Sequence, residues 1–150
     1  MDCIFCKIAK GEIPSYKVFE DDNFLAILDV NPNTKGMTLV MPKNHFDSDV
    51  FLMPDKDYQE LMLVVKKVSE ILKKGLDVNR VAMVAEGMGV NHIHIKLYPL
   101  YGVEKEFKET WAKGKVFFES YQGYISTQLG PEADPEELQK LAEDIRNKAG

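Results

Sequence analysis

Apolar and polar positions follow two different periodicities along this chain of 150 residues. Between residues 57 and 74, apolar side chains recur at the spacing of one helix face. Elsewhere, short runs of β-branched and aromatic residues are separated by clusters rich in Gly, Pro, Asn and Asp, which is typical of strands joined by turns. Strands in succession around one long helix predict an α+β fold built on an antiparallel sheet.

The predicted helix runs from Asp57 to Lys74. Its apolar face consists of Leu61, Val64, Val65, Val68, Ile71 and Leu72. Asp57 and Glu60 have the spacing of a capping box at the helix start. Gly75 tolerates the left-handed conformation that often ends a helix. These signals predict one long amphipathic helix in the middle of the chain.

The strand pattern occurs in five segments, which are Tyr16–Glu20, Phe24–Val30, Met37–Met41, Arg80–Glu86 and Val90–Pro99. The first two are joined by a short turn and predict a hairpin. The last two flank Gly87 to Gly89 and predict an antiparallel pair. Pro99 has no backbone N–H to donate, so it ends the last predicted strand.

Beyond Gly102 the patterns are shorter. The residues Val116–Phe118 form a candidate strand. Asp134 is followed by Pro135, and an Asp cap before a proline in the first turn predicts a helix start. Apolar residues share one face of this helix. The sequence therefore predicts a C-terminal helical extension.

The segment from Val90 to Pro99 carries the most informative pattern, because two of the three histidines of the chain stand at alternate positions in it. Side chains alternate between the two faces of a strand. We therefore expect His92, His94 and Lys96 to share one face with Tyr98. Successive side chains on one face lie roughly 7 Å apart. A row of two imidazoles and an ammonium suits a phosphate group.

An ordinary solvated sheet face can produce the same row. The preceding segment, Gly87-Met88-Gly89, favours a ligand, because glycines let backbone N–H groups approach an anion closely. A Gly-x-Gly segment is also typical of a tight turn between strands. The phosphate interpretation therefore rests on the histidines and glycines together.

Composition narrows the class of protein. The chain is long enough for one domain that buries a core without disulfides. Its net charge of −5 argues against nucleic acid or an anionic membrane as the main partner, since both attract basic surfaces. No signal-peptide pattern and no segment of membrane-spanning length occurs, so we expect a cytoplasmic protein.

Cys3 and Cys6 are the only cysteines and form a Cys-x-x-Cys pair. In a reducing compartment such a pair typically binds metal or does redox work. The redox motif follows a strand, and too few residues precede Cys3 for one. Zinc fits better and needs two further ligands, for which His45 and His92 are available. Two small buried hydrophobic residues would give the same spacing.

Several of these segments together resemble the histidine triad (HIT) family of nucleotide hydrolases and transferases. The resemblance covers residues 1–100 in the family's order, through Cys3–Ile8, Gly11–Pro14, Phe19–Asp22, Leu25–Pro32, Gly36–His45 and His92-x-His94. It implies a HIT-like antiparallel meander that dimerises by joining sheets. Residues 1–100 would form a nucleotide-binding core, with residues 101–150 as a C-terminal extension packed on the same single domain. The expected ligand is a small nucleotide, a purine one, with neither nucleic acid nor membrane as partner.

The resemblance also implies roles for single residues. In the family, the second histidine of the strand, here His94, attacks the α-phosphorus and forms a covalent nucleotidyl intermediate. His92 and Lys96 complete the catalytic row, and Asp29 stands where ribose hydroxyls are held. The remaining nucleotide-binding residues would be Phe5, Ile8, Ile27, Val30, Gly87, Met88 and Gly89. The apolar members of this set could equally be plain core residues.

Lys96 stands where the family has a third histidine. An ammonium with an ordinary pKa of about 10.4 clamps phosphate more readily than it donates a proton at neutral pH. Some bacterial relatives bind zinc through residues that match Cys3, Cys6, His45 and His92.

We therefore expect an enzyme that cleaves or transfers at the α-phosphate of a nucleoside phosphoramidate or a (di)nucleoside polyphosphate, with structural zinc. The alternative is a zinc-stabilised nucleotide-binding or sensing module with little or no turnover. A third, remote class is a zinc-stabilised interaction domain without nucleotide.

Overall fold

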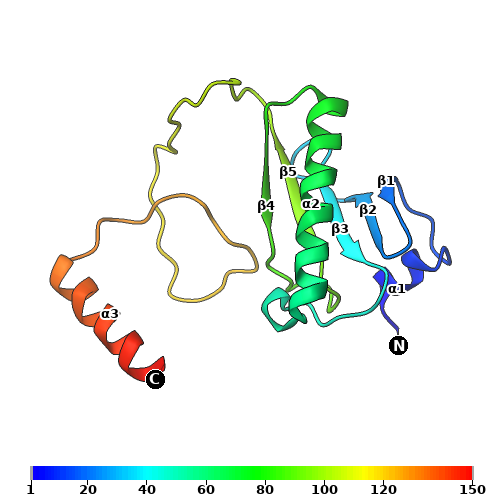
Figure 1. Ribbon diagram of the computed structural model, residues 1–150. Helices are drawn as coiled ribbons and strands as arrows, with labels where there is room; N and C mark the ends of the chain where they lie inside the picture. Colours follow the sequence, from blue (N-terminus) through cyan, green and yellow to red (C-terminus); the bar gives the residue numbers. More distant parts are fainter. Residues whose placement is uncertain (1, 150) are drawn as a thin grey trace. The chain divides into compact units, whose positions relative to one another are not determined.

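The structure is a computed structural model that describes residues 2–149 (Figure 1). The chain divides into two compact units, one that ends at Lys108 and one that begins at Glu109. The first contains helices and a five-stranded antiparallel sheet. This confirms the expected α+β class. The packing of residues 101–150 on the core stays a prediction.

The sheet consists of β1 (Lys17–Glu20), β2 (Phe24–Leu28), β3 (Thr38–Pro42), β4 (Arg80–Val84) and β5 (Ile95–Leu100). The strand order is β1-β2-β3-β5-β4, and every neighbouring pair is antiparallel. The predicted hairpin and the predicted pair of last strands are both present. The last strand in the chain therefore lies between two earlier ones (Figure 1).

Helix α2 (Asp55–Leu76) covers one face of the sheet, as Figure 1 shows. The apolar stripe predicted for it is largely buried, and the sheet residues packed in the same core include Ala26, Val40, Ile95 and Leu97. Helix α1 (Ile4–Ala9) packs in a second core with residues of β2 and β3 that point away from α2. The two faces of the sheet thus carry different helices.

The two ends of α2 differ from the prediction. The helix begins at Asp55 after Pro54 and has no side-chain cap, so the predicted capping box of Asp57 and Glu60 was wrong. Acidic residues in the first turn still suit the positive end of the helix dipole. The helix also continues through Gly75 to Leu76. It ends at Asp77, whose φ of 52° lies in the left-handed region that Asp tolerates better than most side chains.

The histidine segment differs more from its prediction than α2 does. Strand β5 begins only at Ile95, so the strand predicted from Val90 starts too early, and residues 90–94 are irregular. The backbone N–H of Ile93 donates to the carbonyl of Phe46 at 3.1 Å, so this stretch bonds to a loop and not to a strand. Pro99 lies inside β5, opposite Val81. The β3 pairing ends at Leu97, so the proline lies where β5 has one partner strand and needs fewer donors.

Three further helices complete the description. Helix α1 was not predicted, and the 3₁₀ helix η1 (Val50–Leu52) follows Asp49, whose side chain accepts from the N–H of Phe51. Residues 116–118 form no strand in the structure; Val116 makes one backbone bond to Leu129. Helix α3 (Pro135–Ala149) is present, and Asp134 accepts from two backbone N–H groups, as predicted. Among residues 2–149, no helix is both long and apolar enough to cross a membrane.

Candidate metal centre and active site

Four side chains from three separate segments converge beside α1. Cys3 precedes the helix and Cys6 lies in its first turn, whereas His45 follows β3 and His92 precedes β5. Each offers one ligand atom, and these atoms all lie within 4.8 Å of one another. The group matches the predicted metal ligands. The metal-binding interpretation is therefore favoured over two unrelated buried thiols.

The distances in this group fit a tetrahedral metal. The Nδ1 atom of His92 lies 3.5 Å from the Sγ atoms of both Cys3 and Cys6, and the Nδ1 atom of His45 lies 3.4 Å from Sγ of Cys6. A tetrahedral ion with bonds of about 2.3 Å to sulfur and about 2.0–2.1 Å to nitrogen separates such atoms by roughly 3.6 Å. Two thiols and two imidazoles therefore suit a soft or borderline divalent ion.

The ring of His92 is oriented by its second nitrogen. Nε2 lies 2.9 Å from the carbonyl oxygen of Pro42, and because a carbonyl only accepts, Nε2 carries the proton. Nδ1 then presents its lone pair to the metal group. Burial lowers the pKa of this imidazole, which favours the neutral form that a metal needs. Pro42 was missed at the sequence level, because a backbone carbonyl leaves no signal in residue type.

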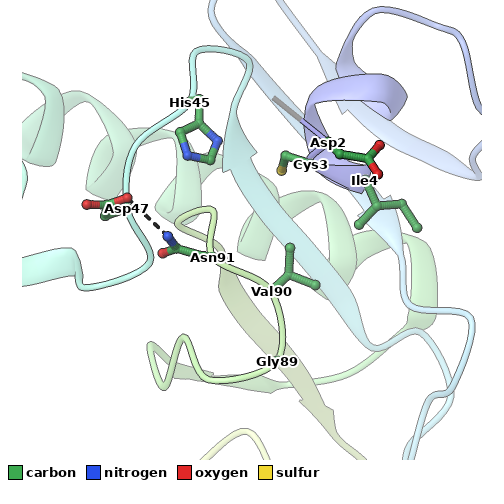
Figure 2. A pocket seen from close by; sticks show the side chains of 8 residues that line it. All are labelled: Asp2, Cys3, Ile4, His45, Asp47, Gly89, Val90 and Asn91. Atoms are coloured by element: carbon green, nitrogen blue, oxygen red, sulfur yellow. Dashed lines mark hydrogen bonds between the residues drawn. The ribbon is translucent and has the colours of Figure 1, made fainter.

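An open pocket lies beside the metal group (Figure 2). It is lined by Asp2, Cys3, Ile4, His45, Asp47, Gly89, Val90 and Asn91. The side chain of Asn91 joins two of its segments: its Nδ2 donates to Asp47 at 3.1 Å, and its Oδ1 accepts from the N–H of Ser48 at 2.9 Å. The loop after β3 and the segment before β5, each with one histidine of the metal group, are thus bonded together.

The two glycines of the Gly-x-Gly segment have different roles. Gly87 has a φ of +72°, and a Cβ there would come within 2.5 Å of the carbonyl oxygen of Ser48. This glycine is required by backbone geometry and close packing. A Cβ on Gly89 would meet open space, so packing does not explain that glycine. Met88 between them is 70% exposed.

His94 is buried and held in one tautomer. Its Nδ1 lies 2.8 Å from the carbonyl oxygen of His92, so Nδ1 carries the proton and Nε2 has a free lone pair. Phe5 of α1 packs edge-on against the ring, with ring centroids 5.2 Å apart. Burial lowers the pKa of His94, and the charge of Lys96 lowers it further. The imidazole is therefore neutral at pH 7 and able to act as a nucleophile.

Lys96 and Tyr98 follow on the sheet face that points away from α2. Ile95 and Leu97 are buried in the core with α2, whereas the two residues that alternate with them are half-buried. Lys96 lies between Leu39 of β3 and Val84 of β4 in the register. The predicted alternation is thus confirmed from residue 95 onward.

Carboxylates lie near this row. The charges of Asp29 and Glu86 partly oppose the lowering of the His94 pKa. They also raise the pKa of Tyr98. The pKa of Tyr98 is raised by burial and then by these two charges, so its hydroxyl stays protonated. Asp29 follows β2, and its Oδ1 accepts from the N–H of Asn31 at 2.8 Å. Tyr98 and Glu86 were given no role from sequence, although the alternation of the strand placed Tyr98 on this face.

The apolar residues of the predicted base pocket separate into two groups. Phe5, Ile8 and Ile27 are buried together in the core beneath α1. Val30 is 74% exposed. The first three therefore pack as core residues in this structure, and their contact with a base stays a prediction.

Comparisons with known proteins bear on this arrangement. The model of the HIT domain matches residues 10–102, which is more than half of the chain. The chain belongs to the HIT family. An uncharacterised HIT-like protein of Methanocaldococcus jannaschii is 48% identical over 104 residues, which cover 66% of this chain and 79% of that protein. The adenosine 5′-monophosphoramidase of Schizosaccharomyces pombe is 30% identical over 149 residues, which cover 99% of this chain and 98% of that protein.

Solved structures with the HIT fold support the same family assignment. The crystal structure of SMU.412c from Streptococcus mutans has a TM-score of 0.71 and 32% identity, covering 99% of this chain and 86% of that one. A HIT family protein of Bacillus subtilis has a TM-score of 0.68 and 30% identity, covering 98% of this chain and 96% of that one. HIT relatives of this chain thus include nucleotide hydrolases, and this places the chain in a family of enzymes.

Proposed function

We propose that this HIT protein cleaves or transfers nucleotides at the α-phosphate through a covalent nucleotidyl intermediate on His94. The observation that carries the proposal is the state of that imidazole. It is buried and neutral, its Nδ1–H is occupied by the His92 carbonyl, and its Nε2 lone pair is available. Among the ordinary nucleophiles of enzymes, an imidazole in this state needs no further base.

The reaction has two steps. The Nε2 lone pair of His94 forms a bond to the α-phosphorus while the bond to the leaving group breaks, and its electron pair goes with the leaving atom. Water then forms a bond to phosphorus, the P–N bond breaks, and the water proton passes to solvent. An acceptor other than water would give transfer in place of hydrolysis.

The other residues bind and orient. Lys96 and the backbone from Gly87 to Gly89 would stabilise negative charge on the phosphoryl oxygens. Asp29 would accept hydrogen bonds from the ribose hydroxyls. The apolar side chains Phe5, Ile8, Ile27, Val30 and Met88 would contact the base, which we infer to be a purine. His92 positions the nucleophile through its carbonyl.

The metal is inferred to be zinc, held by Cys3, Cys6, His45 and His92. Two thiolates and two imidazoles in a closed group are typical of structural zinc, which stabilises the fold and leaves no position open for substrate. The Nε2–H bond from His92 to Pro42 supports this, since zinc-binding histidines commonly donate their second nitrogen.

The partner at the sheet edge is inferred to be a second copy. Strand β4 forms one edge of the sheet. An apolar pocket beside it is lined by Val50, Phe51, Tyr58, Met62, Met83, Ala85 and Ile95. Phe51 is 84% and Met83 59% exposed in the isolated chain. A homodimer that continues the sheet would cover both.

Mass spectrometry tests the catalytic proposal. The protein is mixed with adenosine phosphoramidate or a dinucleoside polyphosphate and quenched within one turnover. A mass increase of one nucleotidyl group that maps to His94 is the expected result. Tight nucleotide binding without adduct or product would instead identify the chain as a binding or sensing module.

Replacing Asp29 with alanine should weaken nucleotide binding more than it slows the chemical step. A hydrogen bond to a charged group contributes about 1.5–3 kcal/mol, so affinity should fall roughly 10- to 100-fold. Titration calorimetry gives the affinity, and single-turnover kinetics at saturation give the chemical step. In the unmutated protein, dideoxynucleotides should bind correspondingly more weakly; equal affinity for both sugars contradicts the role of Asp29.

A further inference from the structure

Lys96 is the residue that the proposed chemistry explains least. It replaces an imidazole that could give a proton to a leaving group, and an ammonium is poorly suited to that task at neutral pH. None of the ion pairs among residues 2–149 includes Lys96. A half-buried ammonium beside a nucleophile, without a carboxylate pair, favours an anion brought by the ligand.

The position of Lys96 indicates which part of the ligand carries this anion. Helix α1 packs over β2 and β3, where the base and ribose are expected, and Lys96 lies next to β3 on β5, between Leu39 of β3 and Val84 of β4. It lies two positions after His94 in the sequence, and after burial its charge is the next cause that lowers the pKa of that imidazole. The positive charge therefore stands close to the proposed nucleophile, where the leaving group departs.

The two expected classes of substrate, phosphoanhydrides and phosphoramidates, differ in their leaving group. When a phosphoanhydride is cleaved, the electron pair goes to a phosphate oxygen, and the product is a stable anion that needs no proton. When a phosphoramidate is cleaved, the electron pair goes to nitrogen, which must gain a proton as the P–N bond breaks. A fixed cation stabilises the first kind of leaving group. It gives no proton to the second and repels an amine that is already cationic.

We propose that Lys96 makes this HIT protein selective for nucleotides whose leaving group is a phosphate or polyphosphate, joined to the α-phosphorus through a phosphoanhydride. This inference rests on the proposed function of His94. It separates the chain from its relatives named adenosine 5′-monophosphoramidases. The carboxylates of Asp29 and Glu86 also act on His94, so Lys96 supplies the positive charge that an anionic leaving group requires beside the nucleophile.

The test compares two substrates that share the same adenylyl half. Diadenosine tetraphosphate and adenosine phosphoramidate are assayed for kcat/KM with the unmutated protein, Lys96→Gln, Lys96→His and Lys96→Arg. The unmutated protein should prefer the tetraphosphate. Lys96→Gln removes a charge that acts on the phosphoryl oxygens of both substrates, so kcat/KM should fall for both. The fall should be roughly 10- to 100-fold larger for the tetraphosphate, given the usual strength of a charged hydrogen bond. Lys96→Arg keeps the charge and should keep the preference.

Lys96→His should act in the opposite direction. An imidazole with a pKa of about 6.5 can protonate an amine at neutral pH, so kcat/KM for the phosphoramidate should rise. Lys74→Gln, at an exposed lysine of α2, is the matched control and should leave both values unchanged. Thermal unfolding of each variant shows whether it is folded.

A binding measurement gives a readout without turnover. Inorganic tripolyphosphate should compete with a fluorescent adenosine nucleotide for the unmutated protein, and at least tenfold less well for Lys96→Gln. Equal competition, a preference for the phosphoramidate in the unmutated protein, or an equal loss on both substrates in Lys96→Gln would overturn the selectivity and leave the role of His94 intact. Absence of any adduct with either substrate would overturn the proposed function itself.

Discussion

Replacing His94 with alanine should reduce turnover roughly 10³-fold or more and remove the covalent nucleotidyl adduct. In the proposed reaction, the imidazole of His94 supplies the attacking electron pair. Nucleotide binding should stay measurable, because Asp29 and the apolar residues beneath α1 are unchanged. Rapid-quench kinetics and intact-protein mass spectrometry measure the two losses, and calorimetry measures the binding.

His94 is buried, so the alanine variant also leaves a cavity. His94→Asn is therefore the matched control, since it fills more of the space and its amide can donate to the His92 carbonyl. Both variants should lose the adduct, whereas the asparagine variant should unfold closer to the temperature of the unmutated protein. Turnover above one hundredth of the original rate in the asparagine variant contradicts nucleophilic catalysis by His94.

Replacing Cys3 with serine should cost at least about 4 kcal/mol of folding free energy, because loss of a ligand from a closed zinc site removes binding energy that belongs to the folded state. The melting temperature should fall by roughly 10 °C or more. A chelator should lower the melting temperature of the unmutated protein toward that of the variant. Metal analysis should find about one zinc per chain, as four ligands around one ion imply.

Ala9→Ser, in the last turn of α1, is the control for this experiment because it adds a hydroxyl to the same helix without touching a ligand. It should retain zinc and most of its stability. Purified protein without bound metal, with both thiols freely titratable, would show that the group of four side chains does not act as a metal centre.

The metal group was predictable from sequence because the residue types are rare in this chain. With two cysteines and three histidines present, four suitable ligands could be combined in few ways. The groups that orient His92 and the proposed nucleophile His94 were not predictable. The carbonyl of Pro42 holds His92, and the carbonyl of His92 holds His94, and any residue type provides a carbonyl.

The main elements of the fold were also predictable, since the periodicity of α2 and of the strands is determined by burial on one face. The residues at which each helix and strand begins and ends were less predictable. The histidine segment has the alternation of a strand from residue 90, yet its first residues bond to the loop at Phe46, a long-range contact that no local pattern contains. Helix α1 is short. It packs through two buried side chains, Phe5 and Ile8, and through the cysteines of the candidate metal group.

The position of β5 has a consequence for how the protein is made. Cys3 and His92 are 89 positions apart, and β5 enters the sheet between two strands that are synthesised before it. A nascent chain that ends before residue 92 has three of the four ligands, and its β3 and β4 each lack an inner neighbour. Such unpaired edges promote association with other chains. Closure of the sheet centre therefore occurs late in biosynthesis, and so would capture of the proposed zinc ion. If that ion is bound, zinc supply during translation should influence how much of the chain escapes aggregation.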